Sequence, residues 1–208
     1  ASGVEMTTPD VRDVTFHLPN KVAIYGGFQM GGTVRNVASY PTLLSGDLLG
    51  NDVVTVSGST LISITGNTEN AYHVLLSVSD TTTTVLDGFT ISGGNAIGNS
   101  HIIVEGEMVS RTGGGGIYLA HSLPHINDCT FENNSADGGG AMRNISSSPL
   151  IELCKFNRNE ATNGGAIMNE HTANPSPFHC VFVANKAVNH RGAMFYYSST
   201  PDINNCTL

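Results

Sequence analysis

The feature that most constrains this chain is a repeat of about 25 residues in its second half. The stretch CTFENNSADGGGAM begins at Cys129, and CKFNRNEATNGGAI begins at Cys154. Three columns keep their register through the repeat: Cys129, Cys154, Cys180 and Cys206; Phe131, Phe156 and Phe182; and Asn134, Asn159 and Asn185. A Gly-Gly-Ala run follows in two units. A repeat of this length predicts a solenoid with one turn per unit.

The repeated units favour short strands over helices. They lack apolar residues at 3.6-residue spacing, and they are shorter than a strand–helix–strand crossover, which takes about 30 residues. Short apolar pieces separated by Gly, Asn, Ser and Pro are typical of strands joined by turns. Equivalent strands of successive turns would lie about 4.8 Å apart. The sequence therefore predicts an all-β fold, a parallel β-helix with about seven or eight turns.

The domain organisation follows from where the repeat is regular. We expect one β-helix domain over residues 1–208, with irregular turns in 1–85, an insertion loop at 97–112 and regular repeats in 113–208. LDGFTISGGNA, from Leu86, aligns with the unit at Ile126 once the insertion is removed. The last unit stops at CTL, so we expect a fragment of a longer protein or a partner at this end. An open last turn would also favour end-to-end self-association.

Each column has a structural interpretation. Cysteine and phenylalanine alternate with period two, so both should point into a dry core, where free cysteine acts as a small hydrophobe. Disulfides between neighbouring turns remain an alternative with awkward geometry, and widely spaced cysteines do not favour zinc. The asparagine column is expected at a turn, in left-handed backbone geometry and bonded along the solenoid. Gly-Gly-Ala would supply a bend without side-chain bulk.

Composition excludes some partners. The chain is 39% hydrophobic and only 12% charged, which predicts a packed fold rather than disorder. Its net charge is -8 and its nine Lys and Arg residues form no cluster. These features argue against nucleic acid and anionic membranes as partners. No apolar run approaches the ~20 residues of a transmembrane helix, so we expect no membrane insertion by this segment.

The motifs FxxN (Phe131–Asn134 and its two copies) and GGAI (164–167) carry a family resemblance. They resemble the passenger regions of chlamydial polymorphic outer membrane proteins and related secreted bacterial surface proteins. The likeness extends over most of residues 21–208, because VAIYGGF and PTLLSGDL resemble the opening segment of such proteins. It implies a right-handed β-helix, an extracellular or cell-surface location, and adhesion to a polysaccharide or a host or cell-surface protein. It implies no active site, because the shared motifs are core and turn columns.

One set of outward charged residues is a candidate catalytic patch: Asp128, Lys155, Arg158 and His179. A polysaccharide lyase needs a cation or metal beside the uronate carboxylate and a base for the neighbouring proton. Asp128 and Glu152 could also form the carboxylate pair of a glycoside hydrolase. No calcium-loop motif is present, although the 97–112 insertion is a candidate calcium site. No other metal or cofactor is expected.

A second set of outward residues is a candidate binding surface. Two residues beyond each Gly-Gly-Ala alanine we expect a column of Leu119, Arg143, Met168 and Phe195, with His121, Glu170, Tyr196 and Tyr197 nearby. Arg143, Met168, Phe195 and Tyr197 are the candidate binding residues. An exposed aromatic and apolar surface suits recognition of sugars or proteins. The alternative is that a loop or another domain covers it.

Three functional hypotheses remain open on this sequence. The leading one is a non-catalytic surface adhesin or carbohydrate-binding scaffold module. The first alternative is a polysaccharide lyase or glycoside hydrolase of pectate-lyase-like architecture. The second is a self-assembling extracellular fibre subunit. Whether the protein is an enzyme is therefore left open.

Overall fold

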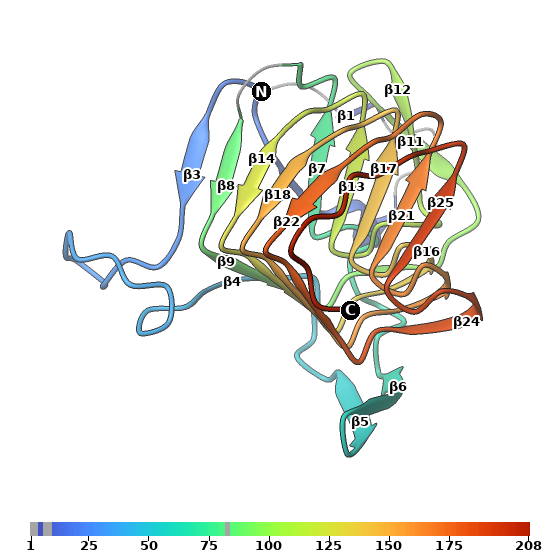
Figure 1. The fold of residues 1–208 in the computed structure, drawn as a ribbon, viewed down its shortest axis with the longest axis horizontal. Coiled ribbons are helices and arrows are strands. Elements are labelled where there is room, and N and C mark those ends of the chain that lie inside the picture. The colour runs from blue at the N-terminus through green and yellow to red at the C-terminus, as the bar shows by residue number, and fades with distance from the viewer. Residues whose placement is uncertain (1–3, 6–9, 82–83) are drawn as a thin grey trace.

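The computed structural model, which describes residues 4–5, 10–81 and 84–208, is a right-handed parallel β-helix (Figure 1), and the predicted fold class is confirmed. Each regular turn passes through four short strands. These stack on the equivalent strands of the next turn into four parallel sheets, named sheets I to IV here in the order in which a turn crosses them. The longest sheet has six strands, so the expectation of seven or eight turns is wrong.

The strands of the four sheets are short and in register. Sheet I contains β2 (Phe16–His17), β7 (Leu75–Val78), β13 (Ile117–Ala120), β17 (Met142–Ile145), β21 (Ile167–Glu170) and β25 (Met194–Tyr197). Sheet II contains β3 (Ala23–Tyr25), β8 (Val85–Asp87), β14 (His125–Asn127), β18 (Leu150–Glu152) and β22 (Ser176–Phe178). Sheet III contains β4 (Thr42–Ser45), β9 (Phe89–Ser92), β15 (Thr130–Glu132), β19 (Lys155–Asn157) and β23 (Val181–Val183). Sheet IV contains β10 (Asn95–Ala96), β16 (Ser135–Gly138), β20 (Glu160–Asn163) and β24 (Lys186–His190).

The remaining elements leave the coil, which is why there are fewer turns than predicted. A 3-10 helix spans Val11–Asp13, and a hairpin is formed by β5 (Val53–Ser57) and β6 (Thr60–Thr65). This hairpin and the segment between β3 and β4 project from the coil (Figure 1). The 97–112 insertion forms a second hairpin, β11 (His101–Val104) and β12 (Glu107–Ser110), to which β1 (Val4–Glu5) adds a third strand. In the described part of the chain, no helix is long and apolar enough to cross a membrane.

The core is built from stacked copies of the same side chain. Phe131, Phe156 and Phe182 pair in register, and their rings stack with centroids 5.1 and 4.7 Å apart. The cysteines are free thiols: Cys129, Cys154 and Cys180 are buried, and Cys206 is half-buried. Burial raises the pKa of the Cys154 thiol. The thiols therefore pack as small apolar groups, as their alternation with phenylalanine predicts.

The asparagine column forms a hydrogen-bond ladder inside the coil. Asn134 Nδ2 donates to Asn159 Oδ1, and Asn159 Nδ2 donates to Asn185 Oδ1, both at 3.0 Å. Each asparagine Nδ2 also donates to a backbone carbonyl, as Asn159 does to Phe131 O at 2.9 Å. The expected left-handed geometry of this column is wrong, because the residue before each asparagine has the positive φ. The asparagines instead satisfy polar backbone at the edge of the core.

Each full turn bends at four corners, and the corner residue is left-handed. One corner column is Asp128, Leu153, His179 and Asn205, with φ between 47° and 53°. Another is Asn133, Arg158 and Ala184, each at 55°. Gly139 and Gly164 occupy the corner before sheet I, where the Gly-Gly-Ala bend was predicted. At such corners an L-residue is strained by about 1–2 kcal/mol and its side chain faces away from the core.

Candidate functional site

The candidate catalytic patch is not assembled into a site. Asp128 and His179 lie in the same exposed corner column, two turns apart, and the exposed Leu153 stands between them. Lys155 is exposed on the outer face of sheet III. The hollows described below are lined by other residues. Corners place side chains in solvent for geometric reasons, so charged residues there need no catalytic explanation.

The other acids and bases of this face are already paired. Arg158 donates to Glu132 Oε2 at 3.2 Å on the preceding turn. Glu152 Oε2 lies 2.6 Å from His125 Nε2, and its strand position pairs with Asn127 rather than with Asp128. Asp128 and Glu152 are therefore one residue out of register, and the Glu152 carboxylate is already bonded to His125. Nothing in this arrangement holds two free carboxyl groups across a cleft.

The candidate binding column is present with one correction. Arg143, Met168 and Phe195 pair in register on the outer face of sheet I, and Tyr118 continues this row on β13. Leu119 does not belong to it, because it is fully buried in the core. Side chains alternate across a strand, so the one-residue difference moves Leu119 to the inner face.

The 97–112 hairpin covers one end of this row. Ile102, Val104 and Val109 of the hairpin pack on Leu76 and Tyr118 of sheet I. The sequence left two alternatives for this surface, exposure for binding or coverage by a loop, and they apply to different turns. Sheet I is covered at β7 and β13. Arg143, Met168 and Phe195, on the following turns, are partly exposed, and these three residues are called the open row. The position of this hairpin could not be predicted from the sequence, because the 97–112 insertion occurs in only one unit of the repeat.

Arg143 is held in a fixed position at the start of the open row. Its Nε donates to Glu170 Oε2 at 2.7 Å, and its Nη1 donates to Thr112 Oγ1 at 3.0 Å. The guanidinium also lies over the ring of Tyr118, 5.8 Å from its centroid. A methyl group at Gly113 would lie 2.5 Å from Arg143 Cδ and 2.6 Å from the backbone oxygen of Gly138, which cannot move aside, so glycine is needed there. The arginine is a preorganised group whose charge is shared with Glu170.

Met168 and Phe195 also lie against glycine backbone. A methyl group added to Gly138 would overlap the sulfur of Met168, and one added to Gly164 would lie 3.0 Å from Phe195 Cβ. The Phe195 ring stacks on His190 with centroids 5.8 Å apart. The glycines therefore do more than bend the chain, because they make room for the outer row.

One shallow hollow lies where sheet IV meets sheet I, and a second lies over sheet IV. The first, of about 150 Å³, is lined by Thr112, Asp137, Gly138, Arg143, Asn163 and Met168. The second, of about 200 Å³, is lined by Ile97, Ser135, Ala136, Asp137, Glu160, Ala161, Thr162, Lys186 and Val188. Asp137 borders both hollows. Burial raises the pKa of the Asp137 carboxyl, and the nearby Arg143 charge offsets part of this rise.

Sequence reasoning missed Asp137, Thr112 and Asn163. Asn163 Oδ1 is a buried acceptor to which no described residue donates. Asn163 lies directly before Gly164, whereas Asp137 lies two residues before Gly139 and in the neighbouring column, because Gly138 pairs with Asn163. A scan of the two positions before each Gly-Gly pair would have found a polar residue in both units.

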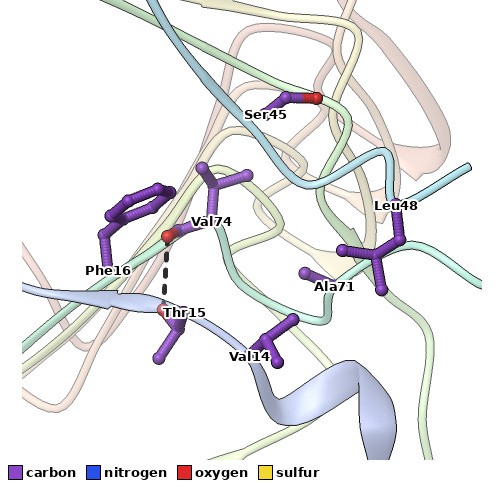
Figure 2. Close-up of a pocket in the computed structure, with 7 residues that line it drawn as sticks. All are labelled: Val14, Thr15, Phe16, Ser45, Leu48, Ala71 and Val74. Atoms are coloured by element: carbon purple, nitrogen blue, oxygen red, sulfur yellow. Dashed lines mark hydrogen bonds between the residues drawn. The ribbon is translucent and has the colours of Figure 1, made fainter. Parts of the chain in front are cut away.

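Two further hollows lie at the first turn and are apolar. One, of about 260 Å³, is lined by Val14, Thr15, Phe16, Ser45, Leu48, Ala71 and Val74 (Figure 2). Its one marked hydrogen bond runs from Thr15 Oγ1 to Val74 O at 3.2 Å. The other, of about 320 Å³, is also bordered by Thr15 and Phe16 and is lined mainly by core aliphatic residues. Both offer apolar contact with few polar groups to orient a ligand.

A buried ion pair ties the insertion to the first turn. Arg111 Nε and Nη2 donate to the two carboxylate oxygens of Asp13 at 2.8 and 2.5 Å. The nearby His73 is fully enclosed, with Nδ1 3.0 Å from Gly114 O. Burial lowers the pKa of His73 to about 4. The ion pair is structural, because the buried side chains of Arg111 and Asp13 bond each other.

The insertion shows no assembled calcium site. Its acids Glu105 and Glu107 lie 3.9 Å from His17 and 3.5 Å from His121. Among the residues that the structure describes, no three His, Cys, Asp or Glu side chains are placed to hold a metal ion together.

The comparisons with known proteins agree with this architecture. The family model described as right handed beta helix region matches residues 2–208. No significant match was found among curated proteins or among solved structures. The match spans nearly the whole chain, and the stacked parallel sheets have the topology that the family description names. The chain belongs to the right-handed β-helix family.

Proposed function

We propose that this chain is a non-catalytic carbohydrate-binding module of a secreted or cell-surface protein, where it acts as an adhesin or scaffold. The observation that carries the proposal is the open row of Arg143, Met168 and Phe195 beside two hollows. Apolar and aromatic side chains pack on sugar rings, and a few fixed polar groups orient them. The surface location follows from the resemblance of the FxxN and GGAI motifs to bacterial surface proteins.

The row suits a polymer better than a single sugar. Neighbouring strands lie about 4.8 Å apart, so each turn adds one contact along the same line. Tyr197 is exposed and pairs in register with Glu170, which extends the row by a second aromatic and a second polar group. A ligand with repeating units would meet similar contacts on successive turns.

The hollows favour binding over catalysis. Their volumes of about 150 and 200 Å³ are below the ~300–1,000 Å³ usual for pockets that enclose a ligand. Two of the three nearby acids are engaged, since Glu170 bonds Arg143 and Glu160 lies 3.6 Å from Lys186. Hydrolysis would need a second carboxyl poised across the bond to be cleaved.

Glycan-array binding, followed by affinity electrophoresis in gels that contain polysaccharide, tests the proposal. Phe195→Ala should weaken binding about tenfold, because it removes a stacking surface worth about 1–1.5 kcal/mol. Phe178→Ala, on the outer face of sheet II, is the matched control and should bind as the wild type does. Equal binding by all three proteins would contradict the assigned surface. Release of unsaturated products from uronate polysaccharides, with calcium or with chelator, would contradict the non-catalytic assignment.

A further inference from the structure

Asp137 borders both hollows, and within the described part of the chain its carboxylate is unpaired because the other charged side chains nearby form ion pairs with one another. Arg143 bonds Glu170 and Thr112, and Lys186 pairs with Glu160. Among the residues that the structure describes, none donates a hydrogen bond to the Asp137 side chain. The charges around the hollows therefore cancel in pairs and leave one negative group at the centre.

A second acceptor without a donor belongs to a residue that lines the same hollow. Asn163 Oδ1 is buried and lacks a partner among the described residues, and Asn163 lines the smaller hollow together with Asp137. A buried acceptor without a donor costs about 1–3 kcal/mol. Arg143 and Thr112 also line this hollow, but the guanidinium bonds Glu170 and the Thr112 hydroxyl. Among the side chains described, Asp137 therefore remains as a carboxylate that no neighbouring side chain bonds.

We propose that this hollow binds a protonated amine and that the ligand is a polysaccharide of amino sugars with free amino groups. The inference rests on the proposed carbohydrate-binding function. An ammonium group carries three donors and no acceptor, which matches Asp137 and Asn163 Oδ1. A uronate brings only acceptors and a like charge to the same place, and an N-acetylated amine brings one donor and no charge.

The neighbouring side chains favour a sugar polymer over a lysine side chain. Met168 covers Gly138 at one wall of the hollow, and Phe195 follows on the next turn with its ring stacked on His190. These groups offer flat apolar contact at the spacing of successive strands, to which the faces of linked sugar rings are suited. Because Asp137 borders the hollow beside Met168, a polymer that follows the row on sheet I would pass next to this carboxylate.

Calorimetry with three oligosaccharides of equal length tests the inference: glucosamine oligomers, N-acetylglucosamine oligomers and galacturonate oligomers, at a pH where the free amine is protonated. The glucosamine oligomer should bind at least about tenfold more tightly than the acetylated one. Asp137→Asn keeps the shape of the side chain and should abolish this preference. Asp128→Asn removes an exposed corner carboxylate on another face and should retain it. Thermal unfolding of each variant checks that it is folded.

The remaining outcomes are decisive in different ways. Equal binding of free and acetylated oligomers, or tighter binding of galacturonate, overturns this inference and leaves the proposed function intact. An absence of binding to every polysaccharide overturns both. A lysine-rich peptide that binds through Asp137 while glucosamine oligomers do not would assign the site to a protein ligand and overturn the inference.

Discussion

The thioether of Met168 lies directly over the backbone of Gly138, one turn away, where any side chain on the glycine would displace it. The two residues meet at the wall of the smaller hollow. A residue with no side chain thereby sets the position of a binding residue on the next turn.

Gly138→Ala should weaken carbohydrate binding while leaving the fold intact. The added methyl group would meet only atoms of the Met168 side chain, which is flexible and can move. We expect the free energy of unfolding to change by less than about 1 kcal/mol and affinity for the ligand to fall several-fold. Urea unfolding and calorimetry measure the two effects. Unchanged affinity would show that the Met168 position is irrelevant to binding.

Gly140→Ala, two residues later, is the matched contrast. There the methyl group would lie 2.5 Å from Gly165 O and 2.6 Å from Glu160 O, which are backbone atoms of the next turn. These strands cannot separate without breaking sheet hydrogen bonds. We expect a loss of about 2–4 kcal/mol in the free energy of unfolding by urea titration. A stability equal to that of Gly138→Ala would contradict the packing described.

Asn159→Ala should be among the most destabilising single changes. It removes the acceptor for Asn134 N and the donor to the Phe131 carbonyl, both buried. Each orphaned group costs about 1–3 kcal/mol, so unfolding free energy should fall by about 3–5 kcal/mol. Asn189→Ala, at an exposed position in β24, should change it by less than about 0.5 kcal/mol. A similar loss for both variants would argue that the ladder has no special role.

Leu153→Gly should stabilise the protein. Leu153 is 58% exposed and has φ of 53°, a conformation that costs a side chain about 1–2 kcal/mol and glycine almost nothing. After the greater flexibility of unfolded glycine is subtracted, a gain of about 0.5–1 kcal/mol is expected by urea unfolding. Leu150→Gly, in the extended strand β18, should instead lose about 1 kcal/mol. Destabilisation by both changes would contradict corner strain.

His73 should make stability fall as the medium is acidified. Its pKa is about 4 when folded and 6.5 when exposed, so the unfolded chain binds more protons between these values. Stability is therefore full above pH ~6.5, declines toward pH ~4 by about 3 kcal/mol, and changes no further through this group below that. Urea titrations across this range should show a flatter profile for His73→Gln. An identical slope in both proteins would assign the pH dependence to other groups.

The regular turns could be predicted because the same position is sampled several times. The repeat places three phenylalanines at equivalent positions: Phe131, Phe156 and Phe182. An inward orientation predicted for one of them therefore applies to all three. The insertion at 97–112 has no copy, so its packing over Tyr118 could not be read from the repeat. The assignment of Leu119 to the outer row was wrong for a similar reason. Its unit lacks the Gly-Gly-Ala sequence from which the register of the other units was counted.

Asp137 and Asn163 were missed for a related reason. They lie in two neighbouring columns that change residue type from turn to turn, and only the structure shows that both border one hollow. Whether the Asp137 carboxylate is left unpaired depends on which acidic residue the nearby Arg143 bonds. Arg143 bonds a carboxylate on the next turn, at a sequence separation of 27 residues.

Because each turn bends at the same four left-handed corners, each turn adds the same length to the coil. Every unit closes at the same angular position, so duplicating one stretch of about 25 residues would advance all later columns by one strand spacing without rotating them. The outer row of sheet I would gain one rung and keep its line. The length of ligand that such a surface can follow is thus set by the number of units, independently of the chemistry that each unit presents.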